Sequence, residues 1–138
     1  MFKNFSFFLT LTAVLVINFF ILVNQAEAKD QYLGVYEDGR EAYVMTETIK
    51  WYEEYRNGYL DAQGYTCTVK AVYPNSNDVE RISYKYMYGP QVDGLEKNGV
   101  FYGFRSEYLK RIKKMPNHPE KRLMDLLIDL YNQGYRGK

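Results

Sequence analysis

A stretch of alternating residues from Gly64 to Tyr88 constrains the fold more than any other part of the chain. It holds two runs rich in β-branched and aromatic residues that alternate with period two, which is typical of half-buried strands. Between them, residues 74–78 read Pro-Asn-Ser-Asn-Asp, a composition that favours a turn. The stretch therefore predicts a central β-hairpin. On the first strand, Cys67, Val69 and Ala71 are expected to share one face, and on the second strand Ile82, Tyr84, Tyr86 and Tyr88 are expected to line up together.

Residues 1–28 have the pattern of a signal peptide. Lys3 supplies a positive start, residues 5–23 form an uncharged apolar run, and Ala26-Glu27-Ala28 places small residues where signal peptidase needs them. We expect cleavage after Ala28, which leaves one domain at 29–138 and no membrane segment. A retained anchor is the alternative, since the run approaches the roughly 20 residues of a membrane span. The protein is thus expected to be exported by a bacterium, to the periplasm, the cell surface or the medium.

Charge and cysteine content exclude several classes of protein. Residues 29–138 carry 17 basic and 16 acidic side chains, whereas nucleic-acid binders normally show a clear basic excess. The single cysteine, Cys67, cannot close a disulfide within its own chain, so the fold has to be held by hydrophobic packing. We expect Cys67 to be a small buried residue, with an intermolecular disulfide as the alternative.

A second hairpin is predicted near the start of the domain. The segments 31–36 and 41–46 flank Asp38-Gly39, and Asp-Gly between alternating apolar residues is a strong hairpin signal. The next segment, 46–55, is compatible with a short helix or a strand, and either would end at Arg56-Asn57-Gly58.

The chain after Tyr88 is expected to contain one more strand and two helices. Gly89-Pro90 should end the hairpin, and 91–99 should be a loop with turns at Asp93-Gly94 and Asn98-Gly99. A short strand is predicted at 100–104, followed by a brief helix capped by Ser106.

The C-terminal region gives the clearest helix, from Asn117 to Gln133. Asn117 or His118 can cap it, Pro119 is tolerated in its first turn, and Gly134 is suited to end it. An apolar stripe at spacings of three and four should pack on the sheet; it comprises Leu123, Leu126, Leu127, Leu130 and Tyr131.

No motif for catalysis, a metal or a cofactor is present in the sequence. A nucleophile dyad would have to join Cys67 to His118, but burial and helix capping already account for these two residues. The sequence has no cluster of cysteine and histidine that would suit zinc. The carboxylate pairs Glu53-Glu54 and Asp125/Asp129 are close in sequence only. We therefore assign no catalytic, metal-binding or cofactor-binding residues.

Two groups of residues are candidates for binding a partner. The rings of Tyr84, Tyr86 and Tyr88 form a row that would be either a binding surface or part of the core. The second group is a run of cations on the brief helix, which would be either a solvated face or a contact for an anionic wall polymer or lipid headgroups. Its members are Lys110, Arg111, Lys113 and Lys114.

The start of the domain resembles the surface-adhesin protein E family of small exported bacterial proteins. The similarity lies in residues 32–36, Asp38-Gly39, the strand at Ala42 to Val44, and Thr48-Ile49-Lys50. The chain departs from the family pattern at Met45-Thr46, where an aspartate is usual, and in lacking cysteines toward its end. The resemblance implies an antiparallel sheet with a packed helix, and binding of host matrix or serum proteins.

Together these patterns predict an α+β domain in which an antiparallel sheet of five or six strands packs against the C-terminal helix. For function, we expect a non-enzymatic interaction module whose partner is a protein or an envelope polymer, and not a nucleic acid. The alternative is a small exported hydrolase, or an inhibitor of one, without a recognisable motif.

Overall fold

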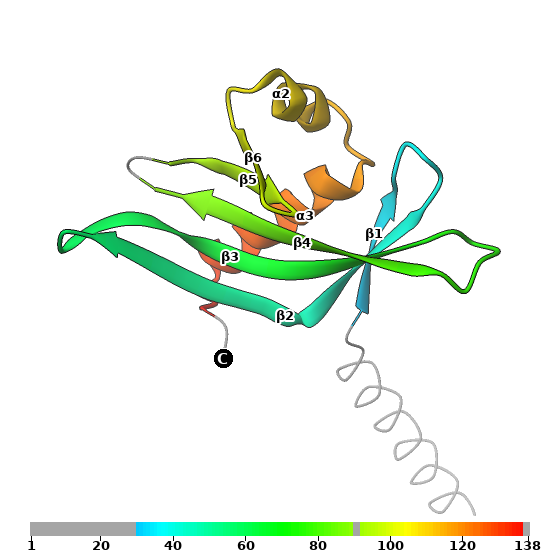
Figure 1. The fold of residues 1–138 in the computed structure, drawn as a ribbon, viewed down its shortest axis with the longest axis horizontal. Coiled ribbons are helices and arrows are strands. Elements are labelled where there is room, and N and C mark those ends of the chain that lie inside the picture. The colour runs from blue at the N-terminus through cyan, green and yellow to red at the C-terminus, as the bar shows by residue number, and fades with distance from the viewer. Residues whose placement is uncertain (1–29, 90–91, 137–138) are drawn as a thin grey trace, which may run out of the picture.

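A computed structural model describes residues 30–89 and 92–136, and it has the predicted α+β architecture (Figure 1). Six strands form one antiparallel sheet in which every strand pairs with its neighbour in sequence. The strands are β1 (Asp30–Val35), β2 (Glu41–Arg56), β3 (Tyr59–Val72), β4 (Val79–Tyr88), β5 (Gly94–Lys97) and β6 (Val100–Gly103). Two helices follow, α2 (Glu107–Lys113) and α3 (Pro119–Asn132). The predicted signal peptide lies outside the described residues, and no helix in the described ranges is long and apolar enough to cross a membrane.

The central hairpin is confirmed, with the predicted faces. Strands β3 and β4 pair with Cys67 opposite Tyr84 and Val69 opposite Ile82. These four side chains point into the core, because alternate residues of a strand lie on one side of the sheet. The opposite face carries polar residues such as Thr66, and no described helix covers it (Figure 1).

The first hairpin is also confirmed, and the ambiguous segment 46–55 belongs to strand β2. Gly39 takes a positive φ of 90° in the turn between β1 and β2. The pairing of β2 with β3 is interrupted between Met45 and Lys50, where the hydroxyl of Thr48 accepts a hydrogen bond of 2.8 Å from the Thr68 amide. This irregularity shifts the alternation of buried residues within one continuous strand, from Ala42 and Val44 before it to Ile49 after it.

The predicted loop at 91–99 is wrong in part, because it contains strand β5. Leu95 is fully buried and pairs with Tyr86 of β4. Gly94 is not a turn residue: a Cβ atom there would lie 2.4 Å from the carbonyl oxygen of Tyr102, so glycine allows β5 and β6 to approach closely. The turn at Asn98-Gly99 is confirmed and has positive φ at both residues. Pro90 lies outside the described residues.

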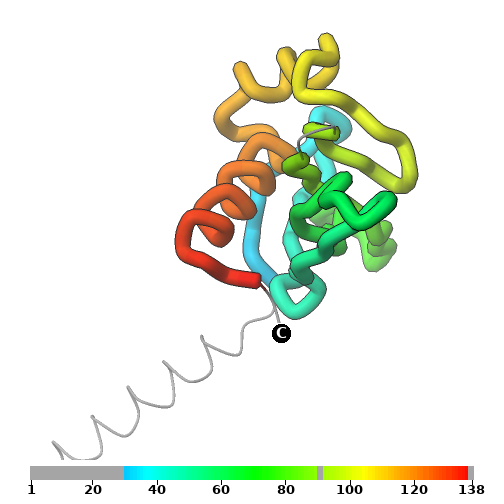
Figure 2. The backbone as a smooth tube through the Cα atoms, turned by 90° about the vertical axis from the view of Figure 1, so that its left-hand side faces the viewer, coloured from blue at the N-terminus to red at the C-terminus, as the bar shows by residue number. Residues whose placement is uncertain are grey.

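Both helices have the predicted caps. The Ser106 hydroxyl accepts from the Leu109 amide at the start of α2, and the His118 side chain caps α3. Helix α3 lies along one face of the sheet. Helix α2 lies above the first turn of α3, at the top of both views (Figures 1 and 2).

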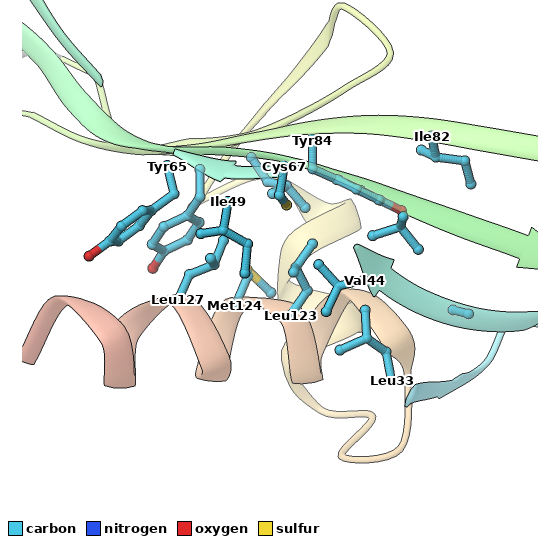
Figure 3. Close-up of a cluster of buried hydrophobic side chains, with 14 of the residues drawn as sticks. Leu33, Val44, Ile49, Tyr65, Cys67, Ile82, Tyr84, Leu123, Met124 and Leu127 are labelled. Atoms are coloured by element: carbon cyan, nitrogen blue, oxygen red, sulfur yellow. The ribbon is translucent and has the colours of Figure 1, made fainter. Parts of the chain in front are cut away.

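The core forms between α3 and the sheet, as Figure 3 shows. Leu123 and Leu127 are fully buried, and each contributes about 1.5–3 kcal/mol to stability by leaving water. Met124 is buried beside them, while the other predicted stripe residues, Leu126, Leu130 and Tyr131, are partly buried. Cys67 is a buried free thiol in this core, and burial raises its pKa to about 12.

Candidate functional site

A buried carboxylate joins the two helices to the sheet. Glu120, in the first turn of α3, is completely buried. The Tyr108 hydroxyl of α2 lies 2.7 and 2.6 Å from its two oxygens, and the Tyr84 hydroxyl of β4 donates to Oε1 at 3.2 Å. Lys97 of β5 adds an ion pair of 3.1 Å. A buried charge is tolerated when it is paired and hydrogen-bonded in this way, so these contacts fix α2 against the rest of the fold.

Two further side chains extend this network. The hydroxyls of Tyr36 and Tyr84 lie 2.9 Å apart, and because Tyr84 donates to Glu120, Tyr36 is the donor to Tyr84. The Nδ1 atom of His118 accepts from the Glu120 amide at 3.1 Å. In a neutral imidazole the proton therefore resides on Nε2, which lies 3.8 Å from a carboxylate oxygen of Glu37.

A polar pocket of about 220 Å³ opens beside this network, and we call it the Glu120 pocket. At its rim, Arg111 of α2 forms an ion pair with Glu37 and lies over the Tyr108 ring, with its guanidinium carbon 5.6 Å from the centroid. The pocket is lined by Tyr36, Glu37, Asp38, Arg40, Lys97, Tyr108, Arg111, His118 and Glu120.

The pKa values of several pocket residues are shifted by burial and by charge. Burial lowers the pKa of His118, although Glu120 and Glu37 oppose the change. Burial, then the hydrogen bond to Glu120, raises the pKa of Tyr108. The hydrogen bond from Arg111 holds the pKa of Glu37 below its usual value. His118 is therefore neutral at neutral pH, while Glu37 is charged and paired with Arg111.

The hydrogen bonds in the Glu120 pocket favour binding of a ligand over proton transfer to or from it. Both oxygens of Glu120 already accept hydrogen bonds, and Nδ1 of His118 is used as a helix cap. A general base needs a free acceptor directed at the proton that it removes. Within residues 30–89 and 92–136, no three histidine, cysteine or acidic side chains are arranged to bind a metal ion.

The four predicted cations lie on the outer surface of α2 and are all exposed. Lys110 pairs with Glu107, and Arg111 pairs with Glu37. Lys113 lies 3.5 Å from the Phe104 carbonyl oxygen and over the ring of that residue. The side chain of Lys114 has no ion-pair partner in the described part of the chain. We call this surface the α2 cationic face, defined by Lys110, Arg111, Lys113 and Lys114.

The predicted tyrosine row does not form an exposed surface. Tyr84 and Tyr86 are buried, with 2% and 3% of their surface exposed, so the alternative in which the row belongs to the core applies to them. Tyr88 is partly buried and stacks on Tyr131 of α3 with ring centroids 5.0 Å apart. Their rings are occupied with packing and are not open to a partner in this conformation.

Sequence reasoning missed the buried network. In the sequence, Glu120 stands in the first turn of a helix, where a negative charge is favourable next to the helix dipole and calls for no other partner. Its partners Tyr84, Lys97 and Tyr108 come from three different elements, and no local spacing in the sequence brings them together.

Comparison of the chain with protein-family models, curated proteins and solved structures found no match.

Proposed function

We propose that this protein is an exported bacterial envelope or secreted protein that binds an anionic envelope polymer without catalysing a reaction. In this proposal the α2 cationic face is the contact surface. The observation that carries it is the concentration of positive charge on one short, firmly anchored helix.

The charge is strongly localised in a domain that is nearly neutral as a whole. Residues 105–114 contain five basic side chains and one acidic one, while the remainder of 29–138 contains 12 basic and 15 acidic ones. A local excess of one sign attracts a polymer of the opposite sign even where the net charge is small. An anionic polymer should therefore bind at residues 105–114.

Anchoring of α2 supports a binding role. Leu109 and Ile112 are fully buried beneath the helix, and Tyr108 is held by the buried Glu120. The cations consequently project from a fixed backbone, which lowers the entropy lost when a partner binds.

Repeated phosphate or carboxylate groups are the chemistry that this face would recognise, because lysine and arginine pair with both. The resemblance to the surface-adhesin protein E family would instead favour a host protein as partner, and that remains a prediction. A hydrolase, or an inhibitor of one, remains the alternative function.

Two double variants with equal charge change test the proposal. Lys110→Gln/Lys114→Gln removes two cations of α2, whereas Lys50→Gln/Arg81→Gln removes two exposed cations elsewhere on the sheet. Binding to polyphosphate and to poly-glutamate is measured by calorimetry at low and high salt, with dextran as the uncharged control. At about 1 kcal/mol per cation near an anionic surface, the α2 variant should bind roughly 30-fold more weakly at low salt.

The sheet variant should bind nearly as well as the parent, and high salt should weaken all binding to the polyanions. Equal losses in the two double variants would show that α2 has no special role. If the parent binds neither polyphosphate nor poly-glutamate, the proposal is refuted.

A further inference from the structure

An apolar groove lies between α3, α2 and the segment that joins β6 to α2. It has a volume of about 280 Å³, and we call it the α2–α3 groove. Its apolar lining comes from Tyr86, Phe104, Met124 and Ile128. Its charged lining residues are Lys113, Lys121 and Asp125. Tyr86 and Met124 belong to the core, so the floor of the groove is rigid, while Ile128 is 37% exposed at its edge.

The charges of the groove leave one cation without a carboxylate. Lys121 and Asp125 form an ion pair of 2.5 Å, one helical turn apart on α3. Lys113 lies with its Nζ atom 4.7 Å from the centroid of the Phe104 ring, and no carboxylate lies within ion-pair distance of it in the described ranges. An ammonium group is thus placed beside an apolar floor, an arrangement that complements a ligand with one anionic group attached to an apolar body.

We propose that the α2–α3 groove binds the acyl chain of a short fatty acid, whose carboxylate pairs with Lys113. The volume equals that of roughly nine water molecules in the liquid, which suits a chain of about eight carbon atoms. The apolar lining contributes to binding by removing the chain from water, and Lys113 fixes the orientation of the ligand. The proposal goes beyond the proposed function, and the two sites share only Lys113.

Sodium octanoate is the probe that tests the inference, with acetate as the ligand without a chain and octyl glucoside as the ligand without a charge. Calorimetry on the purified protein should show that octanoate binds at least tenfold more tightly than either control ligand. If acetate binds as tightly as octanoate, or octyl glucoside does, the groove does not recognise the combination of chain and charge and the proposal fails.

Two pairs of variants locate the ligand. Lys113→Gln should weaken octanoate binding about tenfold, as expected for the loss of one contact between charged groups, while Lys114→Gln on the same helix should change it less than twofold. Ile128→Glu should abolish binding, and Asn132→Glu, one turn further along α3, should leave it unchanged. Equal effects within either pair would overturn the assignment.

Polyanion binding separates this inference from the proposed function. Ile128→Glu should leave binding to polyphosphate and poly-glutamate within about threefold of the parent, because the cations that provide the charge remain. Loss of polyanion binding in the Lys110→Gln/Lys114→Gln variant with retention of octanoate binding would confirm two separable sites. Failure of octanoate to bind a protein that still binds polyanions would refute the groove alone.

Discussion

Replacing Tyr108 by phenylalanine tests how much the buried carboxylate holds α2 in place. The substitution removes only the hydroxyl that contacts both oxygens of Glu120 at 2.7 and 2.6 Å. The ring remains, and it should keep its stack on Tyr102, whose ring centroid is 4.3 Å away. The cost is therefore that of one hydrogen bond to a charged group, without a change in apolar packing.

The expected loss of stability is about 2 kcal/mol, within the usual range for a hydrogen bond to a charged group. Oε2 of Glu120 loses its hydrogen bond, but Tyr84 and Lys97 still contact Oε1, so the larger cost of an unpaired buried charge is avoided. For a domain of about 110 residues, this loss should lower the melting temperature by about 10 °C. The substitution should also accelerate amide hydrogen exchange more in α2 than in α3, because α2 loses a contact with the core.

Tyr102→Phe is the matched control, since the Tyr102 hydroxyl has no hydrogen-bond partner in the described part of the chain. Urea unfolding of both variants measures the difference, and Tyr102→Phe should lie within about 0.5 kcal/mol of the parent. If the two variants are equally stable, the contact between Tyr108 and Glu120 does not anchor α2, and the reasoning is refuted.

Two further predictions concern His118 and Tyr86. Because burial lowers the pKa of His118 below its ordinary value of 6.5, the folded protein binds fewer protons there than the unfolded chain, and stability should fall as the pH drops below about 6.5. His118→Asn keeps a capping side chain but cannot titrate, so unfolding followed between pH 7 and pH 5 should show a smaller loss for this variant; equal losses would contradict the assignment. Tyr86→Ser should lower the melting temperature sharply, since the side chain is 3% exposed. An unchanged melting temperature in that variant would show that Tyr86 does not contribute to the core.

The parts of the fold that follow from local pattern could be predicted from the sequence. Strands β3 and β4 pair with each other without a register shift, so period-two alternation predicts the faces of both, and His118-Pro119 with the leucine spacing predicts α3. Strand β5 was missed because it has only four residues and Gly94 suggested a turn. Gly94 has no side chain, and this allows β6 to pack closely against β5.

The candidate site was predictable only where it depends on one element. The α2 cationic face is visible in the sequence as closely spaced basic residues, and the cations of this seven-residue helix are all exposed. The Glu120 network depends on side chains as far apart in sequence as Tyr36 and Glu120, joined through Tyr84. The pairing of such residues is decided by tertiary packing, and a single sequence gives no signal for it.

The most direct test of the account is to map the binding surface residue by residue. Amide chemical shifts of the protein are followed by NMR while polyphosphate is added at low salt. The account predicts that the largest changes lie in residues 105–114, with smaller changes at Lys121 across the groove. Changes centred on the uncovered face of β2, β3 and β4, with α2 unaffected, would contradict the central claim that α2 is the contact surface.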